Sequence, residues 1–453
     1  MTKLWDMGYR LDREIEEFTV GEDYILDLRL VTADVFGSIA HAKMLSKIGI
    51  LTTNEFSKLK RCLLEILSAG EKRRFKINVE EEDVHTAIEN FLTQKLGDLG
   101  KKIHTARSRN DQVLLDIRLF TRDRLLDIKT EVLNLVRTLA NFAEKNKNVP
   151  MPGRTHTQRA MPSSVGLWAS AFAESLLDDF ELLKTAYRLN NQCPLGSAAS
   201  YGVPLTIDRQ LVSDLLGFKK VQNNVLYANN SRGKIEGVVV FALTQVSEDL
   251  SKLSNDLMFF SIPELGYFTI PKEYCPGSSL MPQKQNPCAL ELIRARSALV
   301  LSRLFQLMVT IRNLPSGYNR DFQETKKPLM ESLDTTEGCL KVATKVFQGL
   351  KVNREVLQSS FTPEIFAADR AVKLATDEGI PFRDAYRKVA KELDKLEIED
   401  PVKNIRSKKH LGAPGNLGLE KLVKKVELEM EAVKKERARL EKVWKRLTQN
   451  INL

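Results

Sequence analysis

The chain has 453 residues, of which 43% are hydrophobic, so it is longer than one ordinary core requires. Its 69 Lys and Arg exceed its 59 Asp and Glu and give a net charge of +10, but Glu is interleaved with this charge, as in residues 420–446. The absence of one basic block disfavours nucleic acid as a partner, and no uncharged apolar run is long enough to span a bilayer.

The opening segment and the cysteines lead to two further expectations. Residues 1–13 carry five charged side chains and no signal-like apolar run, which favours a cytoplasmic protein. The odd number of cysteines, without CxxC spacing, argues against both a disulfide framework and a zinc site. We expect ordinary buried thiols and no bound metal at Cys62, Cys193, Cys275, Cys288 and Cys339.

The first part of the chain predicts short helices. Turn signals at Gly49 and Gly70 divide its apolar segments. We interpret residues 1–110 as an N-terminal helical domain.

Four later segments predict long helices, because none of them contains Gly or Pro: residues 113–146, 167–193, 238–262 and 288–314. In two of them, apolar residues recur in alternating steps of three and four, the spacing of a helix seam. These are Leu125, Ile128, Val132, Leu135, Leu139 and Phe142, and then Val239, Leu243, Val246, Leu250, Leu253 and Leu257. The pattern indicates an all-α fold with a central long-helix bundle over residues 111–361.

The length of these helices has a consequence for assembly. At about 1.5 Å per residue, the segment 113–146 would extend roughly 50 Å, which is too far for one compact domain to cover. Pairing with equivalent helices of other subunits is therefore expected, which predicts a homo-oligomer. A small C-terminal helical domain is predicted for residues 362–453.

One of the five histidines lies in what the sequence predicts to be a rigid polar loop. His156 occurs in "GRTHTQ", within the Pro-containing segment 148–162 that interrupts two predicted helices. Beside Thr155 and Gln158, its imidazole could be held in one tautomer and act as an acid or base near neutral pH. A structural or exposed histidine is the alternative.

A polar segment, "HTARSRNDQ", precedes the first long helix at residues 104–112. Asn110 or Asp111 can cap that helix, and its N-terminus beside Arg107 and Arg109 would attract a carboxylate or phosphate. A capped, solvated turn explains the same residues, so this segment alone leaves both interpretations open.

The segment "GSSLMPQKQNP", residues 277–287, has almost nothing that could fill a core. Its glycine and prolines allow it to move as a hinged lid, and Asn286 with Pro287 suits the start of the next helix. Ser278 could remove a proton only where Lys284 and backbone N–H groups stabilise its alkoxide. A flexible loop without a catalytic role is the alternative.

A fourth polar cluster lies in "LPSGYNRDFQETKKP", residues 314–328. Tyr318, Arg320, Gln323 and Lys326 are spaced so that they can face one side of a helix start. They could bind a polar substrate, or they could form a charged helix cap.

Taken together, these blocks resemble the argininosuccinate lyases of the fumarase/aspartase superfamily. "GSSLMPQKQNP" resembles the signature loop of the superfamily in the form typical of that family, and "HTARSRNDQ" and "GRTHTQRAMP" resemble two further blocks in the expected order. The resemblance spans nearly the whole chain. It implies a three-domain all-α chain whose central helices join those of three copies in a homotetramer, with each active site built from three subunits.

The resemblance also implies a reaction and the residues that perform it. The family carries out the reversible β-elimination of argininosuccinate to arginine and fumarate, in arginine biosynthesis, without a cofactor or metal. Ser278 is implied as the base that removes a proton next to a carboxylate and His156 as the second acid/base group, although the two roles are also assigned the other way round. Glu291 would orient and polarise His156, and donors such as Lys284 would hold the doubly negative intermediate.

Two groups of substrate-binding residues are implied in the same way. The residues that would hold the carboxylate-bearing fumarate part are Lys284 and Asn286. Those for the arginine-like part are Tyr318, Gln323 and Lys326. Asn110 and Thr155 are implied as further contacts, with Arg109 and Gln158 as supporting members.

The chain departs from the family pattern near both ends. An early glycine-rich block of the family is represented only by "LWDMGYRL", residues 4–11. In "FTVGEDYILD", Gly21 or Asp23 stands where the family has a substrate-contacting serine, so no site residue is assigned there. The C-terminal pattern of the family is altered to "LGAPGN", residues 411–416.

The alternatives lie within the same superfamily. Adenylosuccinate lyase, aspartase and fumarase share the signature loop and the elimination but differ in the leaving group. "SRNDQ" and the set Tyr318, Gln323 and Lys326 favour argininosuccinate. Some lineages use the fold as a non-catalytic, crystallin-like structural protein, but the presence of Ser278, His156 and Lys284 favours an enzyme.

Overall fold

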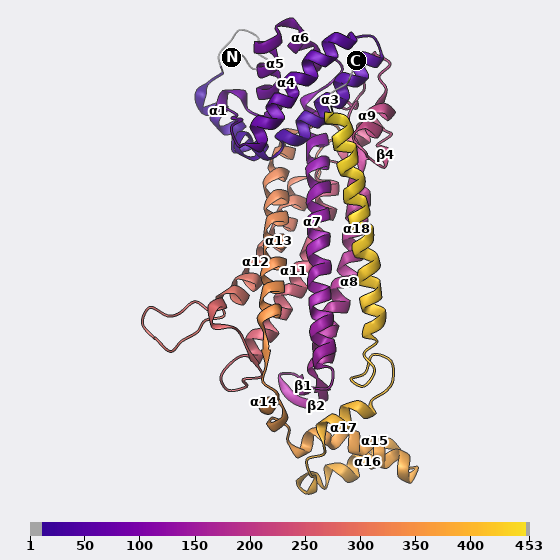
Figure 1. Cartoon of the computed structure of the whole chain (residues 1–453). Helices are drawn as coiled ribbons and strands as arrows, with labels where there is room; N and C mark the ends of the chain where they lie inside the picture. The colour runs from indigo at the N-terminus through magenta and orange to yellow at the C-terminus, as the bar shows by residue number, and fades with distance from the viewer. Residues whose placement is uncertain (1–10, 450–453) are drawn as a thin grey trace.

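The computed structural model describes residues 11–449, and the structural statements below concern that part of the chain. Long helices stand side by side in a tall bundle, with a helical head at one end and a small helical unit at the other (Figure 1). The predicted all-α fold is confirmed, because the strands among the described residues are short and paired two by two. No described helix is both long and apolar enough to cross a membrane. The altered block at residues 4–11 lies almost wholly outside the described residues.

The head is built from short helices whose apolar faces share one core. Val35, Ile39 and Leu63 lie in this core and are buried. A capping box between Thr52 and Glu55 satisfies the first backbone N–H groups of the fourth helix. The helices are α1 (Arg13–Val20), α2 (Asp23–Leu26), α3 (Val31–Lys47), α4 (Thr53–Glu71), α5 (Val84–Leu96) and α6 (Asp98–Lys101), and α9 (Arg209–Leu215) packs against α3.

Five long helices form the bundle. The apolar seams predicted for the first and third face its core, and all their residues are buried except Phe142, which packs against the core from its edge. Fully burying a Leu or Val side chain contributes about 1.5–3 kcal/mol, so these continuous seams are a main source of the bundle's stability. The helices are α7 (Arg109–Asn146), α8 (Val165–Asn190), α11 (Lys234–Phe260), α12 (Cys288–Thr310) and α13 (Lys326–Gly349).

Two predicted helix caps are wrong. Ser108 caps α7: its Oγ accepts the N–H of Asn110, and the Asp111 carboxylate accepts the N–H of Ser108 in return. The helix therefore begins at Arg109, and the two residues expected to cap it lie inside its first turn. α12 does begin as predicted, but Asn286 does not cap it, because the residue in the cap position is a proline that offers no side-chain acceptor.

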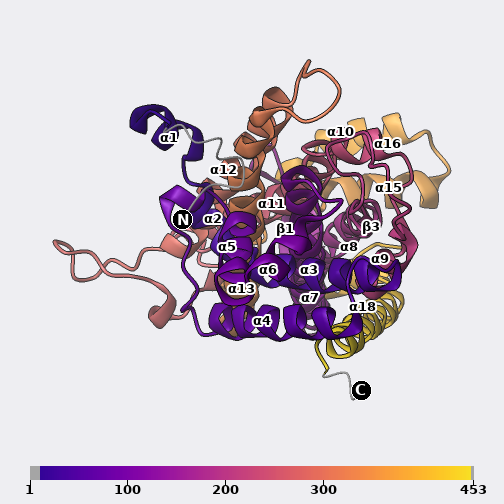
Figure 2. The same ribbon diagram turned by 90° about the horizontal axis from the view of Figure 1, so that it is seen from above.

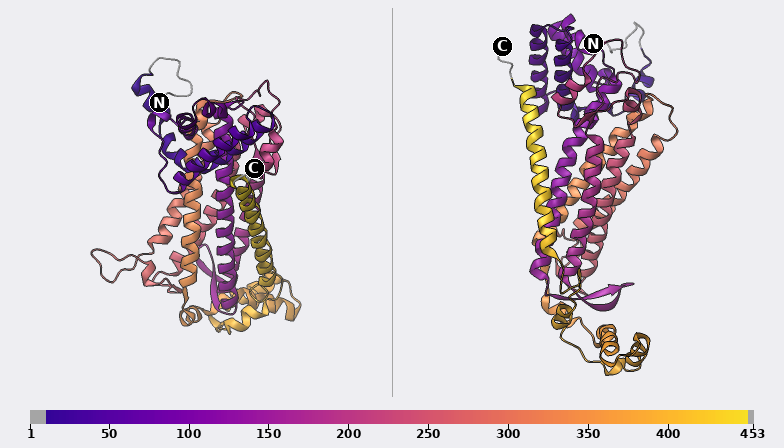
Figure 3. Two further views of the ribbon diagram at one scale, coloured as in Figure 1. Left: turned by 45° about the horizontal axis from the view of Figure 1, so that its top comes forward. Right: turned by 90° about the vertical axis from the view of Figure 1, so that its right-hand side faces the viewer.

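The segment predicted as a rigid polar loop is a β-hairpin. β1 (Pro150–Thr155) and β2 (Gln158–Ser164) pair antiparallel, and His156 and Thr157 form the two-residue turn between them. Both turn residues have positive φ, 52° and 62°, as a type I′ turn requires. The hairpin extends away from the helices (Figure 3).

After the bundle, the chain forms the small unit and then returns to the head. α14 (Arg354–Ser359), α15 (Ala367–Glu378), α16 (Phe382–Ala390) and α17 (Pro401–Ser407) lie at the end opposite the head, and α18 (Leu419–Thr448) runs back beside α7 (Figure 1). Trp444 of α18 stacks on Phe36 of the head with ring centroids 4.4 Å apart. Residues 362–453 therefore lie partly in the small unit and partly along the bundle, where α18 reaches the head. The remaining α-helix is α10 (Val225–Asn230), and the remaining strands are β3 (Gln192–Cys193), β4 (Lys220–Val221), β5 (Phe268–Thr269) and β6 (Lys351–Val352).

Candidate active site

A cavity of about 100 Å³ lies where the head meets the bundle, and we call it the head cavity. Five of the predicted substrate-binding residues line it: Arg109, Asn110, Tyr318, Gln323 and Lys326. The first turn of α7 supplies the first two, and the segment that leads into α13 supplies the others. The fold therefore brings together two polar blocks that are far apart in the sequence.

Lys326 is the charged centre of one wall of the head cavity. Its ammonium nitrogen lies 2.7 Å from Asp27 Oδ1 and 2.9 Å from Asp23 Oδ2, and its side chain is buried. Burial lowers the pKa of Lys326, but the carboxylates of Asp27 and Asp23 outweigh burial and raise that pKa above its ordinary value. The lysine is therefore charged where a ligand would meet it.

Arg109 is clamped by two acidic side chains. Its Nε donates to Asp83 Oδ2 at 2.7 Å, and its Nη2 donates to Glu82 Oε2 at 2.9 Å. Burial lowers the pKa of Arg109, but these two carboxylates outweigh burial and raise it. An arginine tied in this way holds the first turn of α7 and supports its neighbour Asn110.

A buried cluster that the sequence analysis did not predict reaches the head cavity through His85, which lines it. His85 Nδ1 is 2.5 Å from Asp34 Oδ2 and 3.6 Å from Asp116 Oδ2. Burial lowers the pKa of His85, but the hydrogen bond with Asp34 and the nearby carboxylates outweigh burial and raise that pKa. Burial raises the pKa of Asp116 well above its ordinary value. The three side chains are close enough to ligate a metal ion. However, a histidine binds a metal through its neutral imidazole, and the raised pKa of His85 disfavours that form. The raised pKa of His85 and its 2.5 Å contact with Asp34 favour an ion pair between these two side chains instead. No spacing in the sequence marks this cluster, because α3, α5 and α7 each supply one member.

The signature segment 277–287 projects from the body of the protein as a long finger (Figure 2). Its two sides are joined at the base, where Gly277 and Gln285 form an antiparallel bridge and the N–H of Asn286 donates to the carbonyl of Pro276 at 3.1 Å. Such a finger makes few contacts with its own chain, as a segment that closes over a ligand would require.

Ser278 lies near the base of this finger with two donors directed at its hydroxyl. Its Oγ accepts the backbone N–H groups of Leu280 at 3.3 Å and Met281 at 3.1 Å. Backbone dipoles placed in this way would stabilise a serine alkoxide. Lys284 and Glu291 are both exposed, the first on the finger and the second in the first turn of α12.

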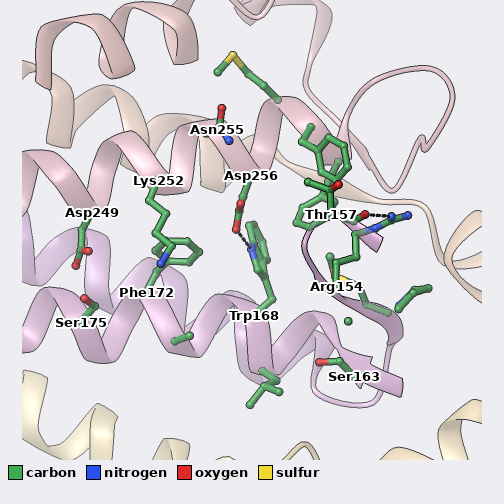
Figure 4. Close-up of a pocket in the computed structure, with 18 of the residues that line it drawn as sticks. Arg154, Thr157, Ser163, Trp168, Phe172, Ser175, Asp249, Lys252, Asn255 and Asp256 are labelled. Atoms are coloured by element: carbon green, nitrogen blue, oxygen red, sulfur yellow. Dashed lines mark hydrogen bonds between the residues drawn. The ribbon is translucent and has the colours of Figure 1, made fainter. Parts of the chain in front are cut away.

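The hairpin residues Thr155, His156 and Gln158 are all exposed. A second cavity, of about 790 Å³, adjoins this hairpin between α8 and α11 (Figure 4), but none of the predicted site residues lines it. One of its polar groups supports the hairpin, since Arg154 Nη1 donates to the carbonyl of Thr157 at 2.7 Å across the turn. A second polar contact joins the two helices, where Trp168 Nε1 donates to Asp256 Oδ2 at 3.0 Å.

The head cavity is far from the hairpin of its own chain. α7 has 38 residues and so extends roughly 55 Å, with Arg109 at one end and the hairpin following the other end. α12, with 23 residues, similarly separates Glu291 from the segment of Tyr318 by roughly 30 Å. The predicted residues therefore form three groups: those of the head cavity, those of the hairpin and those of the finger with Glu291.

Comparison with known proteins gives close relatives over most of the chain. A family model described as Lyase matches residues 10–302. The argininosuccinate lyase of Thermotoga neapolitana is 47% identical over 388 residues, which cover 86% of this chain and 97% of that protein. The argininosuccinate lyase of Sorangium cellulosum is 42% identical and covers 94% of this chain and 98% of its own length.

Solved structures share the fold at lower identity. An EDDS lyase in complex with formate has a TM-score of 0.81 and 20% identity, with 97% of this chain and 95% of that chain covered. A class II fumarase from Schistosoma mansoni has a TM-score of 0.70 and 16% identity, with 86% and 94% covered. At these identities the likeness concerns the fold alone. The match to the lyase family model, together with 42–47% identity to two relatives over most of both chains, shows that the chain belongs to the argininosuccinate lyase family.

Proposed function

We propose that the chain catalyses the reversible β-elimination of argininosuccinate to arginine and fumarate. The observation that supports this most is the head cavity, because residues from two distant blocks, each assigned to substrate by resemblance, line the same space. The cavity carries both positive and negative side chains, as binding of an amino-acid substrate requires. The reaction belongs to arginine biosynthesis, and we place it in the cytoplasm.

Ser278 is the proposed base. Its alkoxide, stabilised by the N–H groups of Leu280 and Met281, takes the proton from the carbon next to a carboxylate of the succinate part. The electron pair left on that carbon passes into the carboxylate, where Lys284 and Asn286 hold the added negative charge. Closure of the finger would exclude water while this charge exists.

His156 is the proposed acid. When the C–N bond breaks, its electron pair stays on the departing guanidino nitrogen, and the imidazolium of His156 gives that nitrogen a proton, so that arginine leaves and the imidazole becomes neutral. Thr155 and Gln158 flank this histidine on the hairpin and contact substrate, and Glu291 orients and polarises it. Reversal of these steps joins arginine to fumarate.

The active site is proposed to assemble from three chains of a homotetramer. The roughly 55 Å length of α7 keeps the hairpin away from the head cavity of its own chain, so another chain must bring His156 there. α12 also exposes large apolar side chains that neighbouring bundles would cover. These are Leu292, Leu299, Leu301, Phe305, Met308 and Val309, with exposed fractions between 48% and 71%.

Within this assembly we propose three units in each chain: residues 1–110, which carry acidic residues of the head cavity; residues 111–361, which carry the finger and the hairpin; and residues 362–453. The partners are then the small-molecule substrate and other copies of the same chain, with no nucleic acid or membrane involved. No cofactor takes part in the proposed steps.

A coupled absorbance assay for fumarate tests the proposed substrate. We expect fumarate from argininosuccinate but not from malate, aspartate or adenylosuccinate at the same protein concentration. Release of fumarate from one of the other three alone would assign the chain to a different reaction of the superfamily. No release from any of the four would favour a structural protein.

A further inference from the structure

The carboxylates of the head cavity differ in how fully their oxygens are used. Asp27 is fully buried, and its two oxygens accept from Lys326 at 2.7 Å and from the N–H of Val84 at 3.3 Å. Each of its oxygens already has a donor within its own chain. Asp27 therefore serves to hold Lys326.

The second carboxylate is engaged in the same way. Asp83 Oδ2 accepts from Arg109 at 2.7 Å, and its Oδ1 accepts the N–H of Thr86 at 2.9 Å. It is also buried. Asp83 therefore serves to hold Arg109 and to cap α5.

Asp23 is the carboxylate that remains open to a ligand. Its Oδ2 lies 2.9 Å from the ammonium nitrogen of Lys326, and between residues 11 and 449 its Oδ1 has no hydrogen-bond partner. Its side chain is 15% exposed, against 0% for Asp27. An additional ammonium group in the head cavity would thus find its acceptor at Asp23.

Arg232 offers the complementary charge. It lines the same cavity and is 3% exposed, yet its Nε and Nη1 have no hydrogen-bond partner among the described residues. Its guanidinium carbon lies 5.7 Å from the ring centroid of Tyr318 and 5.9 Å from that of Phe322, so the group lies beside two aromatic side chains. Leaving a buried donor unpaired destabilises the fold, and a bound carboxylate would offset this through two parallel N–H···O bonds.

The other cations of the cavity are already occupied. Lys326 lies between two carboxylates, Arg109 is bound by Asp83 and Glu82, and Arg320 donates to the carbonyl of Thr19 at 2.6 Å and is exposed. In the part of the chain that the structure describes, neither Arg320 nor Arg232 has an ion-pair partner, and of these two cavity cations only Arg232 is buried.

We propose that Asp23 and Arg232 form a two-ended receptor for the α-amino acid head of the arginine half, with Asp23 accepting the α-ammonium group and Arg232 binding the α-carboxylate. This proposal rests on the proposed function. The α-ammonium and α-carboxylate groups of the ligand are then anchored in the head cavity. The guanidino end of the ligand extends out of the cavity toward the groups that act on the C–N bond. Since Asp23 is one of two residues that stand where resembling lyases carry a serine, the chain would select for the α-ammonium group by charge.

Condensation of fumarate with arginine and with two arginine analogues tests both ends of the receptor. 5-Guanidinopentanoate lacks the α-ammonium group, and agmatine lacks the α-carboxylate. With the wild-type protein we expect KM for each analogue to exceed KM for arginine by about 10–100-fold, the effect of losing one charged hydrogen-bonded contact. Equal KM values for arginine and both analogues would overturn the proposal without any variant.

The variants then assign each end to its residue. Asp23→Asn is expected to raise KM for arginine about 10-fold or more and to leave KM for 5-guanidinopentanoate unchanged. Arg232→Met should do the same for arginine and leave KM for agmatine unchanged, while Arg232→Lys should fall between Arg232→Met and the wild type. KM for fumarate should stay constant throughout.

Glu22→Gln is the matched control, because Glu22 is the neighbour of Asp23 but is exposed and pairs with Lys327 outside the cavity. It should leave every KM unchanged. Asp23→Ser replaces Asp23→Asn should the latter fail to fold. The receptor would be refuted if the variants kept the wild-type KM for arginine. It would also be refuted if an Asp23 variant raised KM equally for arginine and 5-guanidinopentanoate, or an Arg232 variant equally for arginine and agmatine. The wild-type lyase activity would stand in either case. A wild-type protein that forms no argininosuccinate from arginine would refute the proposed function itself.

Discussion

Ser278→Ala and His156→Asn are each expected to lower kcat for argininosuccinate by about two orders of magnitude or more, because each change removes one of the two groups proposed to transfer a proton. His156 is exposed at a hairpin tip and Ser278 lies on the projecting finger, so neither change disturbs a packed core. Initial rates of fumarate formation measure the loss, and size-exclusion chromatography checks the assembly. Wild-type rates in either variant would disprove the assigned mechanism.

Mixing these two variants tests whether the site is shared between chains. A site is intact when its serine comes from a His156→Asn chain and its histidine from a Ser278→Ala chain, which random assembly of equal amounts produces in about a quarter of the sites. We therefore expect the two variants, unfolded together and refolded, to regain about a quarter of the wild-type activity. Each variant refolded alone is the control. Mixed oligomers without recovery would place both groups in one chain.

Asp34→Asn is expected to lower the free energy of unfolding by about 3–5 kcal/mol, because it removes the hydrogen-bonded carboxylate of a buried pair and leaves Asp116, at 3.6 Å, as the carboxylate nearest to His85 Nδ1. The midpoint of urea denaturation at one fixed protein concentration measures the change. Glu65→Gln is the control, because it removes an ion pair at the surface. The side chain of Glu65 is 46% exposed and that of its partner Lys95 is 47% exposed. That change should cost less than about 1 kcal/mol. Equal effects of the two substitutions would show that the buried pair contributes no more than a surface pair.

The effect of Asp34→Asn should also depend on pH. The folded-state pKa of His85 is raised above 6.5, so the contribution of the pair is complete below pH 6.5 and is lost as pH rises through the folded-state value. Burial raises the pKa of Asp34, but the hydrogen bond and charge of His85 lower it below 3.8, so its contribution is present above pH 3.8 and is lost as pH falls through the folded-state value. The difference in stability between wild type and variant should therefore be largest between pH 3.8 and 6.5. A difference that grows from pH 6 to pH 9 would contradict this assignment.

Much of the fold follows from short-range patterns. The seams of α7 and α11 were predicted from apolar spacing alone, and their residues are buried, because a helix in a bundle must place every third or fourth side chain in the core. The hairpin was missed, because its two turn residues are His156 and Thr157 instead of the Asn and Gly that usually mark such a turn. The cap of α7 was misplaced, because several polar residues in a row can each accept a backbone N–H.

The candidate site divides in a similar way. The blocks that carry Asn110, His156 and Ser278 are recognisable in the sequence, since each packs many polar groups into a few residues and resembles a known motif. Arg232 and His85 were missed, because each belongs to an ordinary helical segment and becomes notable only through what surrounds it. An arginine is unusual when it is buried without an acceptor, and burial depends on the whole fold.

The sequence by itself determined the helical class, the family and the polar blocks, because these depend on periodicity and on residues next to each other along the chain. The tertiary structure decided which blocks meet. α7 separates the hairpin from the head cavity. Lys326 at the start of α13 pairs with one oxygen of Asp23, whereas Asp27 receives both Lys326 and the N–H of Val84 in α5. The physical reason is that charge pairing and desolvation depend on distances in space, which residues far apart in sequence acquire only when the chain has folded.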